Sequence, residues 1–163
     1  MAGPQDTRLE QLFAALQTAD ADAAAVIESE IRDIWSDSGS PTLNLLLERG
    51  NAALQDGDSA AAIEHFTALI DHAPDFAEGW NGRATAYFSA GLYGPAMSGI
   101  AHVLALEPRH FGALTGLGVI LEEAGKTDMA LKAYEDVLAI SPHRADVLEA
   151  VHELERQRGG FDT

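Results

Sequence analysis

The 163-residue chain contains no cysteine. That absence excludes thiol nucleophiles, thiolate metal sites and disulfide bonds. It does not identify a compartment, since cysteine-free proteins occur in both reducing and oxidising environments. Aromatic residues are also few, at 7%, whereas alanine is abundant. This composition favours closely packed helices over a β-sandwich.

Basic residues are scarce as well: 10 lysines and arginines stand against 26 acidic residues, for a formal charge of −16. An acidic surface repels phosphate groups, so nucleic acids and anionic membranes are unfavourable partners. No apolar run approaches the ~20 residues that span a bilayer, and we expect no membrane insertion. The excess of acid either serves solubility alone or attracts a basic segment or a cation.

A 34-residue period runs through the middle of the chain. Glycine recurs at Gly57, Gly91 and Gly125, and proline at Pro74, Pro108 and Pro142. A chain reversal is easiest where φ is positive, so the glycines predict turns between paired helices. Proline cannot continue a helix, so each proline predicts the end of the second helix of a pair.

Apolar and small residues keep the same period and recur at helical spacing within each unit. The columns are Leu46, Trp80 and Leu114; Gly50, Ala84 and Gly118; Ala62, Ala96 and Ala130; Phe66, Ile100 and Tyr134. The small columns allow two antiparallel helices to approach closely, and the large columns fill the space between neighbouring helix pairs.

This pattern resembles the tetratricopeptide repeat, with Trp80, Tyr87, Gly91, Ala96 and Pro108 carrying the likeness. The resemblance implies an all-α, right-handed α-solenoid of helix-turn-helix repeats at 43–76, 77–110 and 111–144. It also implies one domain over 5–163 that binds proteins without catalysis. Arg49 and Arg83 occupy an otherwise aliphatic column, and we interpret them as structural variants that bury their stems.

Two helical segments flank the repeats. Residues 5–37 predict an N-terminal helical hairpin without the repeat columns, either a degenerate repeat or an N-terminal cap, with Trp35 in its core. Ser40 is predicted to cap a helix that begins at Pro41. Residues 145–158 predict the polar capping helix that the last repeat of a solenoid needs.

The family resemblance also implies a ligand groove along the first helix of each repeat. Its predicted residues combine apolar, amide, hydroxyl and carboxylate groups, which suit an extended peptide or a helix. They are Asn44, Leu47, Glu48, Asn51, Glu78, Asn81, Thr85, Phe88, Thr115, Val119, Glu122 and Glu123.

Family members that clamp a partner's terminal carboxylate use Lys, Arg and Asn. Asn51 matches one clamp position, but Leu47, Gly82, Gly112 and Gly116 occupy others, so we predict no carboxylate clamp. The glutamates toward the third repeat either favour a basic segment or form only a solvated face.

No catalytic constellation is present: the sequence has no phosphate-binding glycine loop and no His-Glu-x-x-His motif. We therefore predict no enzyme, no cofactor and no metal site, and we expect His110 and His143 to lie on turn surfaces. Two alternatives to a peptide-binding scaffold stay open. They are a structural homo-oligomer, through apolar residues at the ends of the chain, and an envelope protein that handles a metal or a small molecule.

With its N-terminal hairpin and the stretches 73–80 and 106–111, the chain also resembles small alphaproteobacterial repeat proteins that have no established activity and are often predicted to be exported. That resemblance implies the periplasm, with the cytoplasm as the alternative, and it leaves the oligomeric state open.

Overall fold

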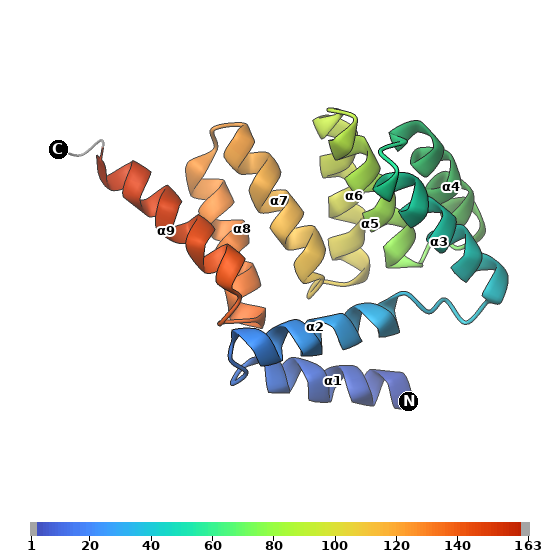
Figure 1. Ribbon diagram of the computed structural model, residues 1–163, viewed down its shortest axis with the longest axis horizontal. Helices are drawn as coiled ribbons and strands as arrows, with labels where there is room; N and C mark the ends of the chain where they lie inside the picture. Colours follow the sequence, from blue (N-terminus) through green and yellow to red (C-terminus); the bar gives the residue numbers. More distant parts are fainter. Residues whose placement is uncertain (1–2, 161–163) are drawn as a thin grey trace. The chain divides into compact units, whose positions relative to one another are not determined.

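A computed structural model describes residues 3–160 of the chain, which form nine α-helices and no strand (Figure 1). The all-α helical-repeat class is thus confirmed. None of the described helices is long and apolar enough to cross a membrane. The helices are α1 (Pro4–Leu16), α2 (Ala21–Trp35), α3 (Pro41–Gln55), α4 (Ser59–His72), α5 (Ala77–Ser89), α6 (Tyr93–Leu106), α7 (Phe111–Glu123), α8 (Thr127–Ile140) and α9 (Ala145–Gly160).

The chain separates into two compact units, and the borders of these units do not coincide with the predicted borders of the repeats. One unit spans Trp35–Gly116 and contains α3 to α6 with the first part of α7. The other joins the described residues up to Ile34 to those from Leu117 onward. Each unit has its own buried contacts.

The periodic glycines form the turns that the sequence predicts. Gly57, Gly91 and Gly125 have φ of 76°, 77° and 75°. In each turn the residue after the glycine donates its N–H to the carbonyl five residues earlier, at 2.9, 2.8 and 2.9 Å. This bond satisfies a carbonyl at the end of the first helix, as in the Schellman motif. A residue with a side chain would be strained at this positive φ, which explains why glycine stands in all three turns. The same turn geometry therefore repeats every 34 residues.

Prolines follow the last hydrogen bond of α4, α6 and α8. The residue before each proline donates to the carbonyl four residues earlier, at 2.9, 2.7 and 2.8 Å, and the helix ends there. The predicted start of α3 is also confirmed, because Ser40 Oγ accepts from the Leu43 N–H at 3.4 Å and Pro41 is the first helical residue.

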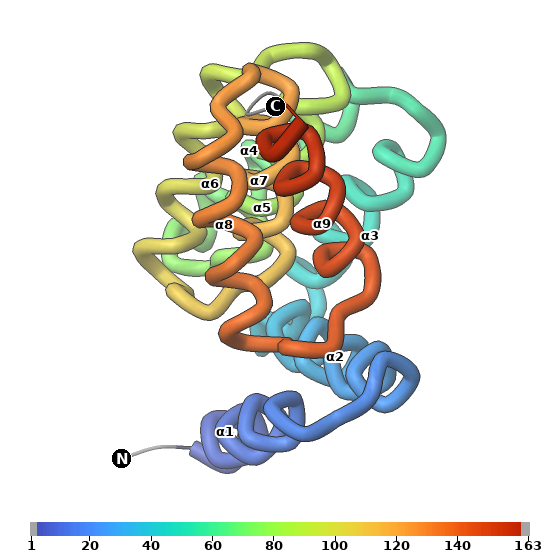
Figure 2. The backbone as a smooth tube through the Cα atoms, turned by 90° about the vertical axis from the view of Figure 1, so that its left-hand side faces the viewer, coloured from blue at the N-terminus to red at the C-terminus, as the bar shows by residue number. Residues whose placement is uncertain are grey.

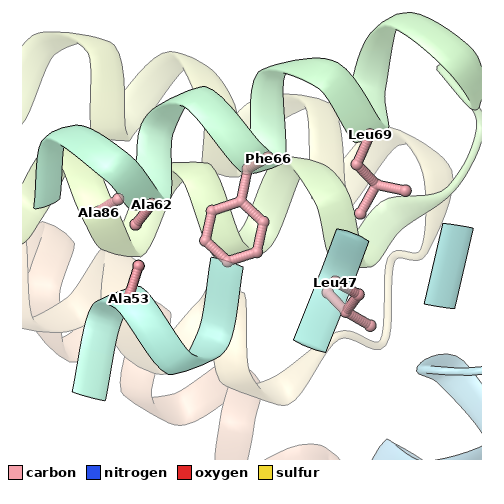
Figure 3. Packing of buried hydrophobic residues seen from close by; sticks show 6 residues of the cluster. All are labelled: Leu47, Ala53, Ala62, Phe66, Leu69 and Ala86. Atoms are coloured by element: carbon pink, nitrogen blue, oxygen red, sulfur yellow. The ribbon is translucent and has the colours of Figure 1, made fainter. Parts of the chain in front are cut away.

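The core of the Trp35–Gly116 unit is built around Phe66 (Figure 3). Its ring is fully buried between α3 and α5, where two glycines face it. A Cβ atom placed on Gly50 would lie 2.6 Å from Cζ of Phe66, and one placed on Gly82 would lie 2.5 Å from it. Such distances are far inside van der Waals contact, so the ring occupies space that only glycine leaves open.

Tyr134 and Gly118 repeat this arrangement in the other unit. A Cβ on Gly118 would lie 2.6 Å from Cδ1 of Tyr134, whose side chain is buried. The second repeat has Ala84 and Ile100 in these two columns. Where the second helix carries a ring, the first helix carries glycine, and where it carries an aliphatic chain, the first helix carries alanine. Within each repeat, a larger side chain on the second helix is therefore matched by a smaller residue on the first helix.

The N-terminal hairpin folds in the same unit as α8 and α9, and Figure 2 shows α8 running into α9 through a short connection. Arg8 links α1 to α2 through Glu30 Oε1 at 2.7 Å. The Gln17 amide donates to the carbonyls of Ala139 and Ile140 at 2.9 and 3.0 Å. Because these carbonyls end α8 without an intrahelical partner, Gln17 caps that helix. The hairpin thus contacts the C-terminal end of α8, far from its own place in the sequence.

Candidate peptide-binding face

Helices α3 and α5 contact each other within the Trp35–Gly116 unit. Five of the predicted groove residues on these helices keep accessible surface, and we call them the α3–α5 face. Glu48, Asn51 and Thr85 are exposed, and Asn81 and Phe88 are half-buried. Phe88 rests against Tyr93, with ring centroids 5.5 Å apart, which fixes its ring at the end of α5. The face thus offers amide, hydroxyl, carboxylate and aromatic groups.

Other predicted groove residues serve the fold. The Asn44 side chain accepts hydrogen bonds from Ser38 N and Ser38 Oγ at 2.8 and 2.5 Å and donates to Asp37 at 3.1 Å. It therefore fixes the connection between α2 and α3. Leu47 is 4% exposed and belongs to the Phe66 core, so it has little surface to offer a ligand.

Glu78 is likewise engaged, by a histidine that our sequence interpretation misplaced. His110 is 3% exposed rather than on a turn surface, and its Nε2 lies 2.6 Å from Glu78 Oε1. The Ala113 N–H donates to His110 Nδ1 at 3.0 Å, so the ring caps the first turn of α7. Since Nδ1 accepts, Nε2 carries the proton that it donates to Glu78. His143 is exposed, as predicted.

Trp35 completes this cluster. Its ring stacks on His110, with centroids 4.6 Å apart, and lies 5.3 Å from the ring of Phe111. Periodicity could not reveal the burial of His110, because the residue lies in a turn. The available signal was its position directly before α7, where a side-chain acceptor is favoured.

In the third repeat, two of the four predicted residues have assigned partners. The Thr115 hydroxyl donates to the Phe111 carbonyl at 2.7 Å. Glu122 accepts a hydrogen bond from the Tyr134 hydroxyl at 2.8 Å. Burial, and then this bond, raise the pKa of Tyr134 well above its ordinary value near 10. Val119 is half-buried and Glu123 is exposed. Membership of all twelve residues in a ligand site stays a prediction.

Within residues 3–160, Arg83 has no acidic partner, although it lies in a strongly acidic chain. Its guanidinium lies 5.0 Å from the ring of Trp80 and 5.7 Å from that of Tyr87, and it donates to Thr67 Oγ1 at 3.3 Å. Trp80 in turn stacks on His102, with centroids 3.9 Å apart. The cation therefore packs on aromatic faces, which explains why arginine is tolerated in a column of aliphatic residues.

Among residues 3–160, no three histidine or acidic side chains gather closely enough to hold a metal ion. What the geometry provides is a set of parallel helices with accessible mixed side chains, which is the architecture of a helical-repeat binding protein.

Comparisons with known proteins agree with this class. Residues 47–98 and 100–145 match the family model described as tetratricopeptide repeat. A TPR repeat-containing protein of Rhizobium etli is 44% identical over 157 residues, covering 96% of this chain and 77% of that protein. The chain belongs to the tetratricopeptide repeat family, whose domains are protein-binding scaffolds.

Solved structures show the same fold. The first TPR domain of Spaghetti (RPAP3), bound to the HSP90 peptide SRMEEVD, superposes with a TM-score of 0.68 at 25% identity, over 72% of this chain and 93% of that one. MamA protein superposes with a TM-score of 0.66 at 20% identity, over 97% of this chain and 85% of that one. The second likeness concerns the fold alone.

Proposed function

We propose that this protein is a non-enzymatic scaffold that binds an extended segment of a partner protein on the α3–α5 face. The observation that carries the proposal is the accessible row of Asn81, Thr85 and Phe88 along α5, beside Glu48 and Asn51 on α3. Asparagine side chains can bond the main chain of an extended peptide, and Phe88 offers an apolar contact for a side chain.

The preferred segment is basic or neutral rather than acidic. The α3–α5 face has a carboxylate and no lysine or arginine, and the whole chain carries a charge of −16. A family neighbour is described in complex with the acidic peptide SRMEEVD. Carboxylates of such a peptide would meet Glu48 without a cation to pair with, and like charges at short range cost affinity.

The proposal is tested by fluorescence anisotropy with two labelled heptapeptides. One is SRMEEVD, and the other has its three acidic residues replaced by lysine and its carboxyl terminus amidated. We expect the basic peptide to bind at least about tenfold more tightly, which corresponds to ~1.4 kcal/mol. Phe88→Ala should weaken that binding by about tenfold, since aromatic anchors dominate such interfaces.

Leu106→Ala is the matched control, because Leu106 is an exposed apolar residue on α6 in the same unit, 38% exposed. Circular dichroism establishes that both variants remain folded. Equal affinity of the wild type and the Phe88→Ala variant for the basic peptide would refute the assignment of the α3–α5 face. Tighter binding of SRMEEVD would refute the charge preference.

A further inference from the structure

A small cavity lies between α2 and the start of α9, within the unit that contains the N-terminal hairpin. Its volume is about 300 Å³, at the lower end of the range for small-molecule sites. On α2 its apolar wall consists of Ala21, Ala24 and Ala25, which stand at i, i+3 and i+4 and so share one face of the helix. Ala145 on α9 continues this wall. Alanine leaves open the space that a larger side chain would fill, so the wall suits a short alkyl group.

Glu28 lines the same cavity, although its side chain is only 8% exposed. Its Oε1 atom is enclosed, and no residue among 3–160 donates a hydrogen bond to it. Its Oε2 atom lies 4.0 Å from Arg32 Nη1, which is longer than a hydrogen bond. A buried carboxylate oxygen without a donor is unfavourable. Because the last torsion of a glutamate is soft, an oxygen can turn toward a donor that enters the cavity.

The other charged residues of the wall are paired or screened. Arg144 Nε lies 3.0 Å from Asp146 Oδ1, so these two charges offset each other. Arg32 has half of its side chain in contact with solvent, where water and salt screen its charge. The acidic residues of α2 outnumber its one arginine, and they are Asp22, Glu28, Glu30 and Asp33. The field along this helix therefore favours a positive ligand over a negative one.

We propose that this cavity binds a primary alkylammonium ion with a short chain. The ammonium group donates to a carboxylate oxygen of Glu28, and the alkyl chain packs against the alanine wall. A hydrogen bond between a charged donor and a carboxylate is about twice as strong as one between neutral groups, and an ammonium group offers several N–H donors. A free amine and the lysine side chain of a partner protein share this chemistry.

An NMR titration of the isotope-labelled protein at neutral pH tests the proposal. The probe is n-propylamine, and n-propanol is the neutral molecule of equal size. We expect saturable shifts of the amide resonances in α2 and at the start of α9, with a Kd on the order of 1 mM for n-propylamine. The alcohol should bind at least about tenfold more weakly.

A third probe, Nα-acetyl-lysine N-methylamide, distinguishes the two sources of the ammonium group. It carries the lysine side chain with no other charge. Tighter binding of this probe than of n-propylamine would assign the cavity to a lysine of a partner protein. Weaker binding would assign it to a free amine.

Glu28→Gln keeps the size of the side chain but removes its charge, and it should weaken n-propylamine binding by at least about tenfold. Asp33→Asn is the matched control, because Asp33 is exposed on the same helix outside the wall and the net charge changes equally. Ala25→Leu fills the cavity and should abolish binding. Ala23→Leu, which is likewise exposed on α2 but outside the wall, should leave binding unchanged.

Circular dichroism establishes that the variants are folded, and if Glu28→Gln is not, the two leucine variants still decide the question. The proposal would be overturned if n-propylamine gave no saturable shifts up to about 20 mM, or if n-propanol bound as tightly. Undiminished binding to the Ala25→Leu variant, or equal losses from Glu28→Gln and Asp33→Asn, would overturn it as well.

Discussion

Replacing Gly118 with alanine tests how closely the helices of the third repeat approach. The new Cβ would lie 2.6 Å from Cδ1 of Tyr134. That ring is 2% exposed and its hydroxyl is bound to Glu122, so it has no open space to move into. Forcing extra atoms into a well-packed core costs typically 1–3 kcal/mol, and the fixed ring places this case near ~3 kcal/mol.

Helix propensity opposes that cost. Alanine is favoured over glycine by ~1 kcal/mol inside a helix, which leaves a net destabilisation of ~2 kcal/mol. For a chain of this size, that loss lowers the melting temperature by roughly 4–8 °C. Gly116→Ala, in the same helix, isolates the propensity effect, because its Cβ would lie 3.8 Å from Ile100 Cδ1, an ordinary contact. That variant should be stabilised by ~1 kcal/mol.

Urea unfolding of both variants measures the difference, and a double variant identifies its cause. Tyr134→Ile reproduces the size of Ile100 in the second repeat. In that background Gly118→Ala should no longer be unfavourable, so the two substitutions should couple by ~2–3 kcal/mol. The packing described for this repeat would be refuted by a Gly118→Ala variant as stable as Gly116→Ala, or by substitutions that add independently.

Two further predictions concern single polar side chains. The folded protein favours the neutral phenol of Tyr134, because its pKa is raised above the value of ~10 in the unfolded chain. The neutral phenol therefore contributes fully to the free energy of unfolding below pH ~10, and this contribution declines as the pH rises further. Tyr134→Phe should make the free energy of unfolding less dependent on pH above that value, and it should cost ~1 kcal/mol at neutral pH because the hydrogen bond to Glu122 is lost. Urea unfolding at a series of pH values measures both effects. An unchanged slope of stability against pH would contradict the prediction. His110→Ala should lower the free energy of unfolding by ~2–3 kcal/mol, since the Ala113 N–H and the Glu78 carboxylate both lose a partner. His110→Asn keeps an acceptor for the helix start and should cost less in urea unfolding, and equal losses would exclude the capping role.

The repeat architecture could be predicted because its determinants are local. Gly57, Gly91 and Gly125 specify positive-φ turns, and prolines at the same period end the second helices. Contacts inside a helix pair depend on spacing along one short segment, so each can be read from the period alone. Helices α3, α5 and α7 begin at Pro41, Ala77 and Phe111, while the bounds of the repeats stay a prediction.

The candidate site was less accessible to sequence reasoning. Spacing places Asn44, Glu78 and Glu122 on the predicted ligand-facing side of their helices, but the structure gives each an internal partner. Whether a polar side chain is free for a ligand depends on residues elsewhere in the chain, such as the buried His110. No periodic signal specifies those partners.

The sequence by itself therefore determined the helices, their pairing in three repeats and the turns between them, since these rest on backbone preferences and nearest-neighbour packing. Only the tertiary structure decided where the N-terminal hairpin packs. Gln17 caps α8 across 122 residues of sequence, and α2 meets α9 around an enclosed carboxylate at Glu28. Contacts at such separation join residues that are distant in the sequence, so the spacing of residues along a single helix does not reveal them.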